Sequence, residues 1–343
     1  MKKLSLMALF SLLGLFACKG YDNLSADDFQ KKLATDGSVQ LLDVRTPEEF
    51  AEGRIPGAIN IDWKAEGFLE AVSATLDAAR PVLVYCRSGR RSAEAASALQ
   101  KAGFQVTNLL GGINAWKESG KPVTTYEVER FRTGAGAPLE VWLIKHGSLA
   151  ISFKGLSIQV DPVIKLGKVT DYAADFPKAD YILVTHEHGD HLDNEAIGIL
   201  GGEVIANPNS AELLGRGKVM TNGESMELAE GILLDAVPAY NYTEGHLQFH
   251  PQGRDNGYIL TLDGFRIYIA GDTEDIPELA SVKDIDLAFL PCNQPYTMTV
   301  EQLVKAAQII KPKVLIPYHF GQTDLSGLPE ALPGIDVRLR DMQ

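Results

Sequence analysis

The side chains best suited to bind metal are concentrated between Thr185 and Asp193, in the run Thr-His-Glu-His-Gly-Asp-His-Leu-Asp. This run directly follows the apolar stretch Tyr181 to Val184, which predicts a buried strand. Residues two apart in extended backbone face the same way, so His186 and His188 can bind one ion together. Imidazole is a ligand of zinc and of non-haem iron. The spacing therefore predicts a metal site at the end of this strand.

The same run can also bind a second ion. Asp190 and His191 follow Gly189, which lets the chain turn so that both side chains can face another metal. A solvated polar loop is the alternative interpretation, but three histidines and an aspartate within six residues at a strand end are rich in ligands and poor core material. The H-E-x-x-H pattern of zinc proteases does not fit, because position 190 is aspartate.

A cysteine at the end of another predicted strand, Pro81 to Tyr85, is the candidate nucleophile. Cys86 opens a loop that leads into an alanine-rich predicted helix. Amide groups at a helix N-terminus and nearby arginines favour the thiolate, and such a loop forms an anion cradle. The loop residues are Arg87, Ser88, Gly89, Arg90, Arg91 and Ser92. The alternative role, a small buried hydrophobic side chain, fits poorly with three arginines.

Two domains are expected to position these residues. Residues 24–123 alternate short apolar runs with amphipathic stretches, which indicates a parallel sheet with helices on its faces. The Gly/Pro-rich change of composition at residues 124–137 predicts a linker. Residues 138–343 begin with predicted strands, and a later pair is joined by Asp263-Gly264, a strong hairpin signal.

Composition excludes several classes of protein. A length of 343 residues fits two domains, and a hydrophobic content of 45% rules out a mainly disordered chain. The formal net charge of -13 argues against nucleic acid as a partner, because neutralising phosphates requires clustered Lys and Arg. Three cysteines, at positions 18, 86 and 292, are too few for a disulfide scaffold.

The first residues are expected to direct the chain out of the cytoplasm. Residues 1–17 have a positive start and an apolar stretch that is too short to span a bilayer. Their end, Leu-Phe-Ala followed by Cys18, is similar to a bacterial lipobox, which implies cleavage and lipid attachment at this cysteine. Residues 18–23 would then be a tether. We expect a lipid anchor in the membrane of a bacterial cell envelope, at the outer membrane facing the periplasm.

The pattern H-x-H-x-D-H resembles the metal motif of the metallo-β-lactamase superfamily, and the resemblance runs over residues 139–343. Tyr268 to Thr273 and Val314 to Gly321 are similar to later segments of that family that carry ligands. The resemblance implies an αββα sandwich with two divalent ions, zinc first and manganese or iron as alternatives. The implied ligands are His186, His188, Asp190, His191, Asp272 and His319. It also implies that Asp272 bridges the ions and that Asp161 is a structural acid near them.

One position departs from the family pattern. Most of the superfamily has a histidine after the strand that Ile232 to Val237 would form here, and the nearest match in this chain is Asn241. His246 and His250 follow shortly afterwards, and either could return to the centre as a ligand. We therefore expect His250 or Asn241 to complete the first site, and otherwise a weaker first site or a single tightly bound ion. For both histidines a place on a surface loop is the alternative.

Residues 24–123 resemble the rhodanese (sulfurtransferase) domain. Its recurring motifs match Leu41 to Phe50 (L-L-D-V-R-T-P-E-E-F), Ile55 to Asn60 (I-P-G-A-I-N) and Leu110 to Trp116 (L-G-G-I-N-A-W). The resemblance implies an α/β rhodanese-like domain in which Cys86 carries sulfur as a persulfide, with the loop amides, Arg87 and Arg91 holding the charge. Related phosphatases use a loop one residue longer, which argues against a phosphatase.

Three hypotheses of function follow. The first is a metal-dependent hydrolase of a small-molecule ester, lactone or phosphodiester, in which Asp190 orients the attacking water and the sulfurtransferase-like domain forms a Cys86 persulfide. The second is persulfide metabolism, in which Cys86 delivers sulfur to an iron-dependent site like that of a persulfide dioxygenase. The third is a non-catalytic module that binds sulfur or metal.

Overall fold

The protein is represented by a computed structural model, which describes residues 20–36, 38–167 and 169–342. The chain divides into two compact units, the first formed mainly by residues before Pro122 and the second mainly by the residues from Pro122 onward. The predicted signal segment 1–17 and the predicted lipidation residue Cys18 lie outside the described residues. Among the residues described, no helix has the length and apolar character needed to cross a membrane.

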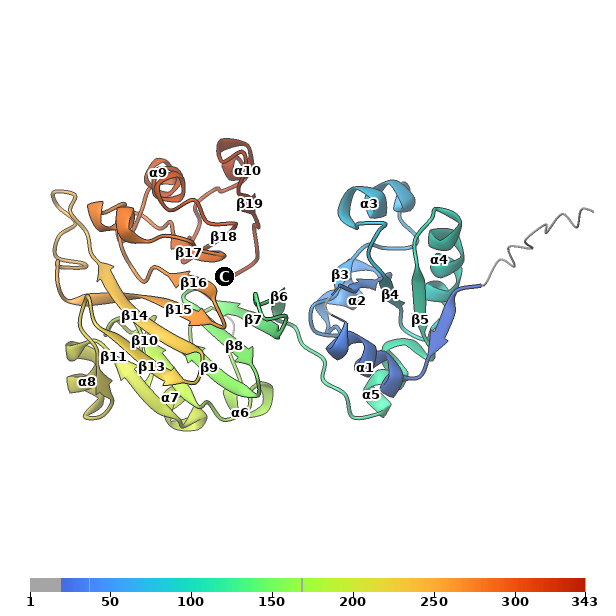
Figure 1. The fold of residues 1–343 in the computed structure, drawn as a ribbon, viewed down its shortest axis with the longest axis horizontal. Coiled ribbons are helices and arrows are strands. Elements are labelled where there is room, and N and C mark those ends of the chain that lie inside the picture. The colour runs from blue at the N-terminus through green and yellow to red at the C-terminus, as the bar shows by residue number, and fades with distance from the viewer. Residues whose placement is uncertain (1–19, 37, 168, 343) are drawn as a thin grey trace, which may run out of the picture. The chain divides into compact units, whose positions relative to one another are not determined.

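The first unit is a parallel α/β fold (Figure 1). Its five strands are β1 (Asp22–Leu24), β2 (Gln40–Asp43), β3 (Ile59–Asn60), β4 (Val82–Tyr85) and β5 (Val106–Leu109). They form one sheet in the order β1-β5-β4-β2-β3, and every neighbouring pair is parallel. The helices are α1 (Ala26–Thr35), α2 (Pro47–Ala51), α3 (Phe68–Thr75), α4 (Arg90–Lys101) and α5 (Gly112–Glu118).

Both faces of this sheet are covered, as continuous apolar strands require. All four residues of β4 are buried. Val82 and Val84 belong to a core cluster with apolar side chains of α3 and α4, including Val72 and Leu99. On α1 and α5, Phe29 and Trp116 pack edge to face with ring centroids 6.3 Å apart. The predicted α/β class of this domain is confirmed, but the predicted tether of 18–23 is too long, because Asp22–Leu24 forms β1 and pairs with β5.

The second unit contains two seven-stranded sheets. The first has the order β12-β11-β10-β9-β8-β7-β6 and consists of β6 (Glu127–Arg132), β7 (Pro138–Lys145), β8 (Ser148–Phe153), β9 (Leu156–Val160), β10 (Tyr181–Val184), β11 (Glu203–Ala206) and β12 (Lys218–Val219). The second has the order β13-β14-β15-β16-β17-β18-β19 and consists of β13 (Ser225–Ala229), β14 (Ile232–Ala239), β15 (Asp255–Leu262), β16 (Phe265–Ile269), β17 (Leu287–Pro291), β18 (Val314–Tyr318) and β19 (Asp336–Val337).

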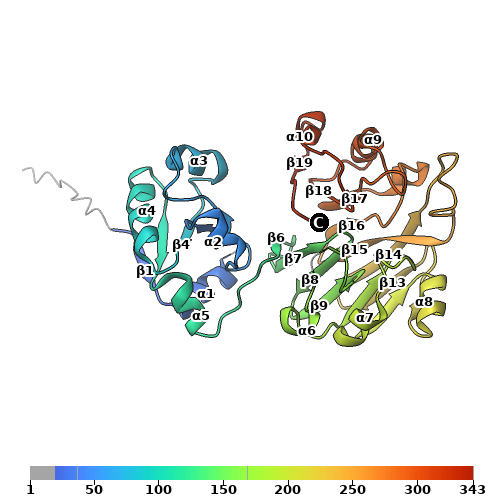
Figure 2. The same cartoon turned by 180° about the vertical axis from the view of Figure 1, so that it is seen from behind.

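Helices cover the outer faces of the two sheets, as Figures 1 and 2 show from opposite sides. They are α6 (Tyr172–Asp175), α7 (Asn194–Leu200), α8 (Pro208–Leu214), α9 (Val300–Ile310) and α10 (Leu328–Ala331), together with the 3-10 helix η1 (Pro277–Ser281). Alternating side chains of β15 divide between two layers: Tyr258 and Leu260 join the core between the sheets, whereas Ile259 joins the core under α9. The predicted αββα sandwich is therefore confirmed.

The predicted linker at 124–137 is wrong in its central part. Glu127–Arg132 forms β6, which pairs antiparallel with β7 over six residues. The charged side chains of β6 make it look like a solvent-exposed segment in the sequence, because the residues that pair with them lie near the end of the chain. Glu129 is buried and is bound by the guanidinium groups of Arg338 and Arg340. A strand whose charges are neutralised by residues 200 positions away has no local apolar pattern to reveal it.

One end of the sandwich collects the polar residues. β9, β10 and β11 are parallel neighbours, as are β16, β17 and β18, so several carboxyl ends point to the same edge. Asp161 follows β9, Thr185 follows β10 and His319 follows β18. The turn between β7 and β8 reaches the same edge, because Leu149 at the start of β8 pairs with Val160 at the end of β9.

Two adjacent leucines of β14 test this layered architecture. Leu234 is fully buried between the sheets, whereas Leu233 is 46% exposed. We expect Leu234→Ala to lower the free energy of unfolding of the second unit by about 2–5 kcal/mol, because it opens a cavity in the core. The matched variant Leu233→Ala should cost about 0.5 kcal/mol or less. Urea-dependent hydrogen exchange of the β14–β15 pair in the full chain measures both, and equal losses would contradict the assigned faces.

Candidate metal centre

Asp161 joins the ends of β9 and β10 and supports the metal motif. It adopts a left-handed backbone with φ of 42°. Its carboxylate accepts hydrogen bonds from the Thr185 amide at 2.8 Å and the Thr185 hydroxyl at 2.6 Å. The same carboxylate is 2.8 Å from Nδ1 of His191. An ionised carboxylate can only accept a hydrogen bond, so Nδ1 of His191 donates one to Asp161. A neutral His191 ring then presents the lone pair of Nε2 to the centre. Asp161 is thus a positioning residue, as the family resemblance implies.

The first ligand cluster consists of His186, His188 and His250, whose ring nitrogens lie within 4.8 Å of one another. His186 and His188 leave β10 two residues apart, as the spacing predicts. His250 is buried, and its Nδ1 lies 2.9 Å from Asp255 at the start of β15. Of the two alternatives left open for this site, the structure therefore places the ring of His250 beside those of His186 and His188.

The loop between β14 and β15 explains how His250 reaches the centre. Glu274 is fully buried and accepts hydrogen bonds from the amides of Tyr242 and Thr243, both at 2.8 Å. Asn241 donates from Nδ2 to the carbonyl of Tyr296 at 2.8 Å. Nδ1 of His246 lies 3.4 Å from Oε1 of Glu274, and His246 belongs to none of the ligand clusters found among the described residues. These polar contacts fix the loop, which places His250 in the first cluster and leaves His246 outside it.

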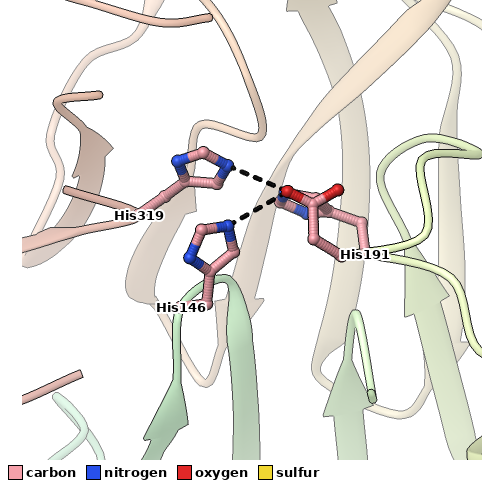
Figure 3. Close-up of side chains that lie close together, drawn as sticks. His146, His191 and His319 are labelled. Carbon is pink, nitrogen blue, oxygen red and sulfur yellow. Dashed lines mark hydrogen bonds and ion pairs between the residues drawn. The ribbon is translucent and has the colours of Figure 1, made fainter. Parts of the chain in front are cut away.

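The second cluster consists of His146, Asp190, His191 and His319. Nε2 of His146 is 3.2 Å and Nε2 of His319 is 3.5 Å from the same oxygen of Asp190, Oδ2 (Figure 3). Gly147 allows the turn to pack against His191, because a Cβ at Gly147 would lie 2.7 Å from the His191 ring. His146 was not predicted. Its only signal is a His-Gly pair in the turn between two apolar strands.

Asp272 lies between the two clusters. Its Oδ2 is 3.3 Å from Nε2 of His250 and 3.1 Å from Nε2 of His319, and its Oδ1 is 3.4 Å from Nε2 of His191. His186 is further away, at 3.9 Å. One carboxylate within reach of nitrogens from both clusters is the arrangement that a bridging ligand requires.

The donor set fits divalent ions. The atoms that face the centre are buried and have no hydrogen-bond partner among the described residues: Nε2 of His186, His191, His250 and His319, and Oδ1 of Asp272. Such groups are costly unless something binds them. When two ligand atoms bind one zinc ion with tetrahedral geometry, they lie about 3.3 Å apart. The distances from the Asp272 oxygens to the ring nitrogens of His191, His250 and His319 match this value. His and Asp are also the donor types that zinc, manganese and iron accept.

Electrostatics supports the same conclusion. Burial alone would raise the pKa of Asp272, but His319 and His191 hold it well below its ordinary value. Burial opposes protonation of His250 and His319, yet the adjacent carboxylates raise their pKa values to about 9 and about 10. The carboxylates therefore favour positive charge at this centre, which divalent ions would supply.

The cysteine loop of the first unit is built as a cradle. Sγ of Cys86 accepts hydrogen bonds from the Gly89 amide at 3.2 Å and the Ser92 hydroxyl at 3.4 Å. Gly111 and Gly112 precede Ile113, which also contacts this loop. Gly112 packs closely against Cys86, since a Cβ on Gly112 would lie 2.3 Å from the Cys86 carbonyl oxygen. The amide of Ile113 donates to that oxygen at 2.8 Å. These contacts fix the loop backbone around the sulfur.

The arginines of this loop do not act alike. Arg91 forms a two-point ion pair with Glu49, at 2.7 and 2.8 Å, and this hydrogen bonding lowers the pKa of Glu49 to about 2. The side chain of Arg90 is 86% exposed, and Arg87 is exposed as well. Cys86 and Cys292 are both free and buried. The expectation that the arginines keep Cys86 from being buried is therefore wrong, because this residue is 1% exposed and belongs to the core cluster of the first unit. Cys292 packs in the core under α9, and burial raises the pKa of its thiol to about 12.

Comparison with known families agrees with both domains. The family model of the beta-lactamase superfamily domain matches residues 140–319, more than half of the chain. The chain belongs to this family. A second model, the rhodanese-like domain, matches residues 25–119. The protein is therefore a rhodanese-like domain followed by a metallo-β-lactamase-fold domain, and its relatives are metal-dependent hydrolases. The resemblances drawn from the sequence are confirmed for both domains.

Individual relatives cover the second unit. A metal-dependent hydrolase of Archaeoglobus fulgidus is 31% identical over 194 residues, which are 52% of this chain and 81% of the relative. One of Thermus thermophilus is 31% identical over 192 residues, covering 53% and 84%. The crystal structure of a protein described as a candidate metal-dependent hydrolase, from Parabacteroides distasonis, is 54% identical with a TM-score of 0.61. It covers 64% of this chain and 100% of its own.

The two histidines of the β14–β15 loop provide a matched test of the first cluster. We expect His250→Ala to lower the affinity for one ion by at least about 10-fold, because a ring nitrogen of the cluster is lost. His246→Ala should bind as many ions as the unaltered protein, since His246 lies outside the clusters. Zinc content after equilibrium dialysis against buffered free zinc measures both. Loss of an ion in His246→Ala but not in His250→Ala would reverse the assignment.

Proposed function

We propose that the second unit hydrolyses an ester, lactone or phosphodiester of a small molecule, using two divalent ions of which zinc is the first expectation. The observation that supports this most strongly is Asp272, whose oxygens lie within 3.4 Å of ring nitrogens from both histidine clusters. One cluster could hold a structural ion, but two clusters that share a carboxylate suit a reaction centre. The metal-dependent hydrolases among the relatives support the same reaction class.

When bound, the two ions would supply hydroxide at neutral pH by lowering the pKa of water from 15.7 to about 7, and they would polarise the scissile group. Asp190 then has a role that the other carboxylates cannot have. Its side chain is 36% exposed, whereas that of Asp272 is 3% exposed and that of Asp161 is fully buried. Burial opposes ionisation of Asp190, but the nearby rings of His146 and His319 keep its pKa below the ordinary value. An ionised, accessible oxygen can accept a hydrogen bond from the attacking water and orient it.

We further propose that Cys86 accepts sulfane sulfur. Its thiolate would attack the outer sulfur of thiosulfate, so that a new S–S bond forms while the sulfur–sulfur bond of thiosulfate breaks and sulfite leaves with the bonding electrons. The persulfide would then give its terminal sulfur to an acceptor such as cyanide, which restores the Cys86 thiolate. The Gly89 amide and the Ser92 hydroxyl, which already donate to Sγ, support this role.

The two sites can be tested in one experiment, because each serves as the other's control. We expect Asp190→Asn to lower hydrolysis of the best substrate in an ester, lactone and phosphodiester panel by about 100-fold or more, since the oriented water is lost. It should leave thiosulfate:cyanide sulfur transfer unchanged. Cys86→Ala should abolish sulfur transfer and leave hydrolysis unchanged.

Turnover by either site excludes a module that only binds sulfur or metal. The absence of hydrolysis from the whole panel, with the protein loaded with zinc, manganese or iron, would contradict the hydrolase proposal. The presence of a rhodanese-like domain on the same chain favours a second candidate, an iron-dependent persulfide dioxygenase-like reaction. That candidate predicts one iron per chain and oxygen uptake with glutathione persulfide, whereas the second histidine cluster favours two ions.

The location and partners of the protein belong to the same proposal. We infer a small-molecule substrate, no nucleic acid partner, and attachment to a membrane of the bacterial envelope through lipid on Cys18. The Leu-Phe-Ala-Cys sequence and the net charge of -13 support this inference. Retention of a Cys18→Ala variant in the membrane fraction would contradict the anchor.

A further inference from the structure

His146 lies outside the family motifs quoted from the sequence, yet the fold fixes it tightly against the second cluster. Its amide donates to the carbonyl of Met342 at 2.5 Å, and its carbonyl accepts from the amide of His319 at 3.2 Å. Its backbone is left-handed, with φ of 47°, a conformation that is unfavourable for histidine. Two backbone hydrogen bonds with segments distant in the chain therefore hold this left-handed turn residue in place.

The ring is directed into the centre. Nε2 of His146 is 3.2 Å from Oδ2 of Asp190, slightly closer than Nε2 of His319 at 3.5 Å. The rings of His146 and His319 lie 3.7 Å apart between centroids, and Figure 3 shows both pointing to the same oxygen. Separations near 3.3 Å are those of atoms that coordinate one ion at zinc distances. His146 thus meets the same geometric criterion as the ligands that the motifs identify.

The ring of His146 is largely shielded from solvent, since its side chain is 17% exposed. A ring nitrogen that faces the centre can offer its lone pair to an ion when it carries no proton.

We propose that Nε2 of His146 is a ligand of the second ion, together with Asp190, His191 and His319. The second site then has three imidazoles and one terminal carboxylate in addition to Asp272, more protein ligands than the first site. This inference rests on the proposed two-ion centre and adds one ligand to it. It predicts that the second ion is the more tightly held of the two and that chelators remove the first ion first.

Counting the histidines that bind metal tests the proposal on the unaltered protein. The chain contains seven histidines. In the full chain labelled with ¹⁵N-histidine and loaded with ¹¹³Cd, we expect two cadmium signals and scalar couplings from six histidines, with His246 uncoupled. One signal should couple to His146, His191 and His319. If His146 is uncoupled while the other five couple, the proposal is wrong and the two-ion centre stands. If two cadmium signals are not found, the proposed function fails first.

Variants at position 146 give an independent measurement. Asparagine tolerates a left-handed backbone, so His146→Asn removes the imidazole with little added strain. We expect its dissociation constant for the second ion to rise about 10–100-fold, measured by zinc competition with a chromophoric chelator. The control is Lys154→Asn, at another left-handed turn residue with φ of 49°, in the exposed turn between β8 and β9. It should bind both ions as the unaltered protein does.

His146→Asp separates a ligand from a hydrogen-bond partner. A carboxylate can replace imidazole as a metal ligand, so this variant should recover most of the affinity that His146→Asn loses. If His146 only donates a hydrogen bond to Asp190, a second carboxylate there would repel Asp190, and affinity would fall below that of His146→Asn. Wild-type affinity in His146→Asn, or no recovery in His146→Asp, overturns the proposal. Should either variant fail to fold, the cadmium experiment on the unaltered protein decides.

Discussion

The polar end of the second unit is built around the Asp272 carboxylate, which buried histidine ring nitrogens surround. Nε2 of His186, His191, His250 and His319 and Oδ1 of Asp272 are buried and have no hydrogen-bond partner among residues 20–36, 38–167 and 169–342. Folding alone leaves these atoms unsatisfied. Divalent cations resolve this cost. Two further carboxylates orient the rings. Asp161 binds Nδ1 of His191 and Asp255 binds Nδ1 of His250, so that Nε2 of each ring faces the centre.

The sandwich makes this arrangement rigid. The clustered side chains come from the ends of β10 and β18, from the turns after β7 and β16, and from the loop before β15. These elements meet because parallel strands end at one edge and because the core between the sheets fixes their spacing. His319 and His146 are joined through their backbones and both have left-handed conformations. Strain at such positions is typical of functional sites in which the fold, and not local preference, sets the geometry.

The sequence predicts the fold class and six of the clustered side chains, because motif spacing at strand ends is local information. It left His250 and Asn241 as alternatives, since only the fixed loop decides which side chain returns. It missed His146, a single histidine in a turn that becomes significant only when β8 pairs with β9. It also mistook β6 for linker, because the charges of Glu129 are neutralised by Arg338 and Arg340 from the other end of the chain. Each miss depends on contacts between distant residues, which periodicity cannot reveal.

The central claim is that Asp272 joins two ions. Anomalous diffraction at the zinc edge, from crystals of the zinc-loaded full chain, tests it most directly. The account predicts two strong peaks about 3.5–4 Å apart, both in contact with Asp272. A single peak bound by His186, His188 and His250 alone, or peaks that leave Asp272 without metal, would contradict it.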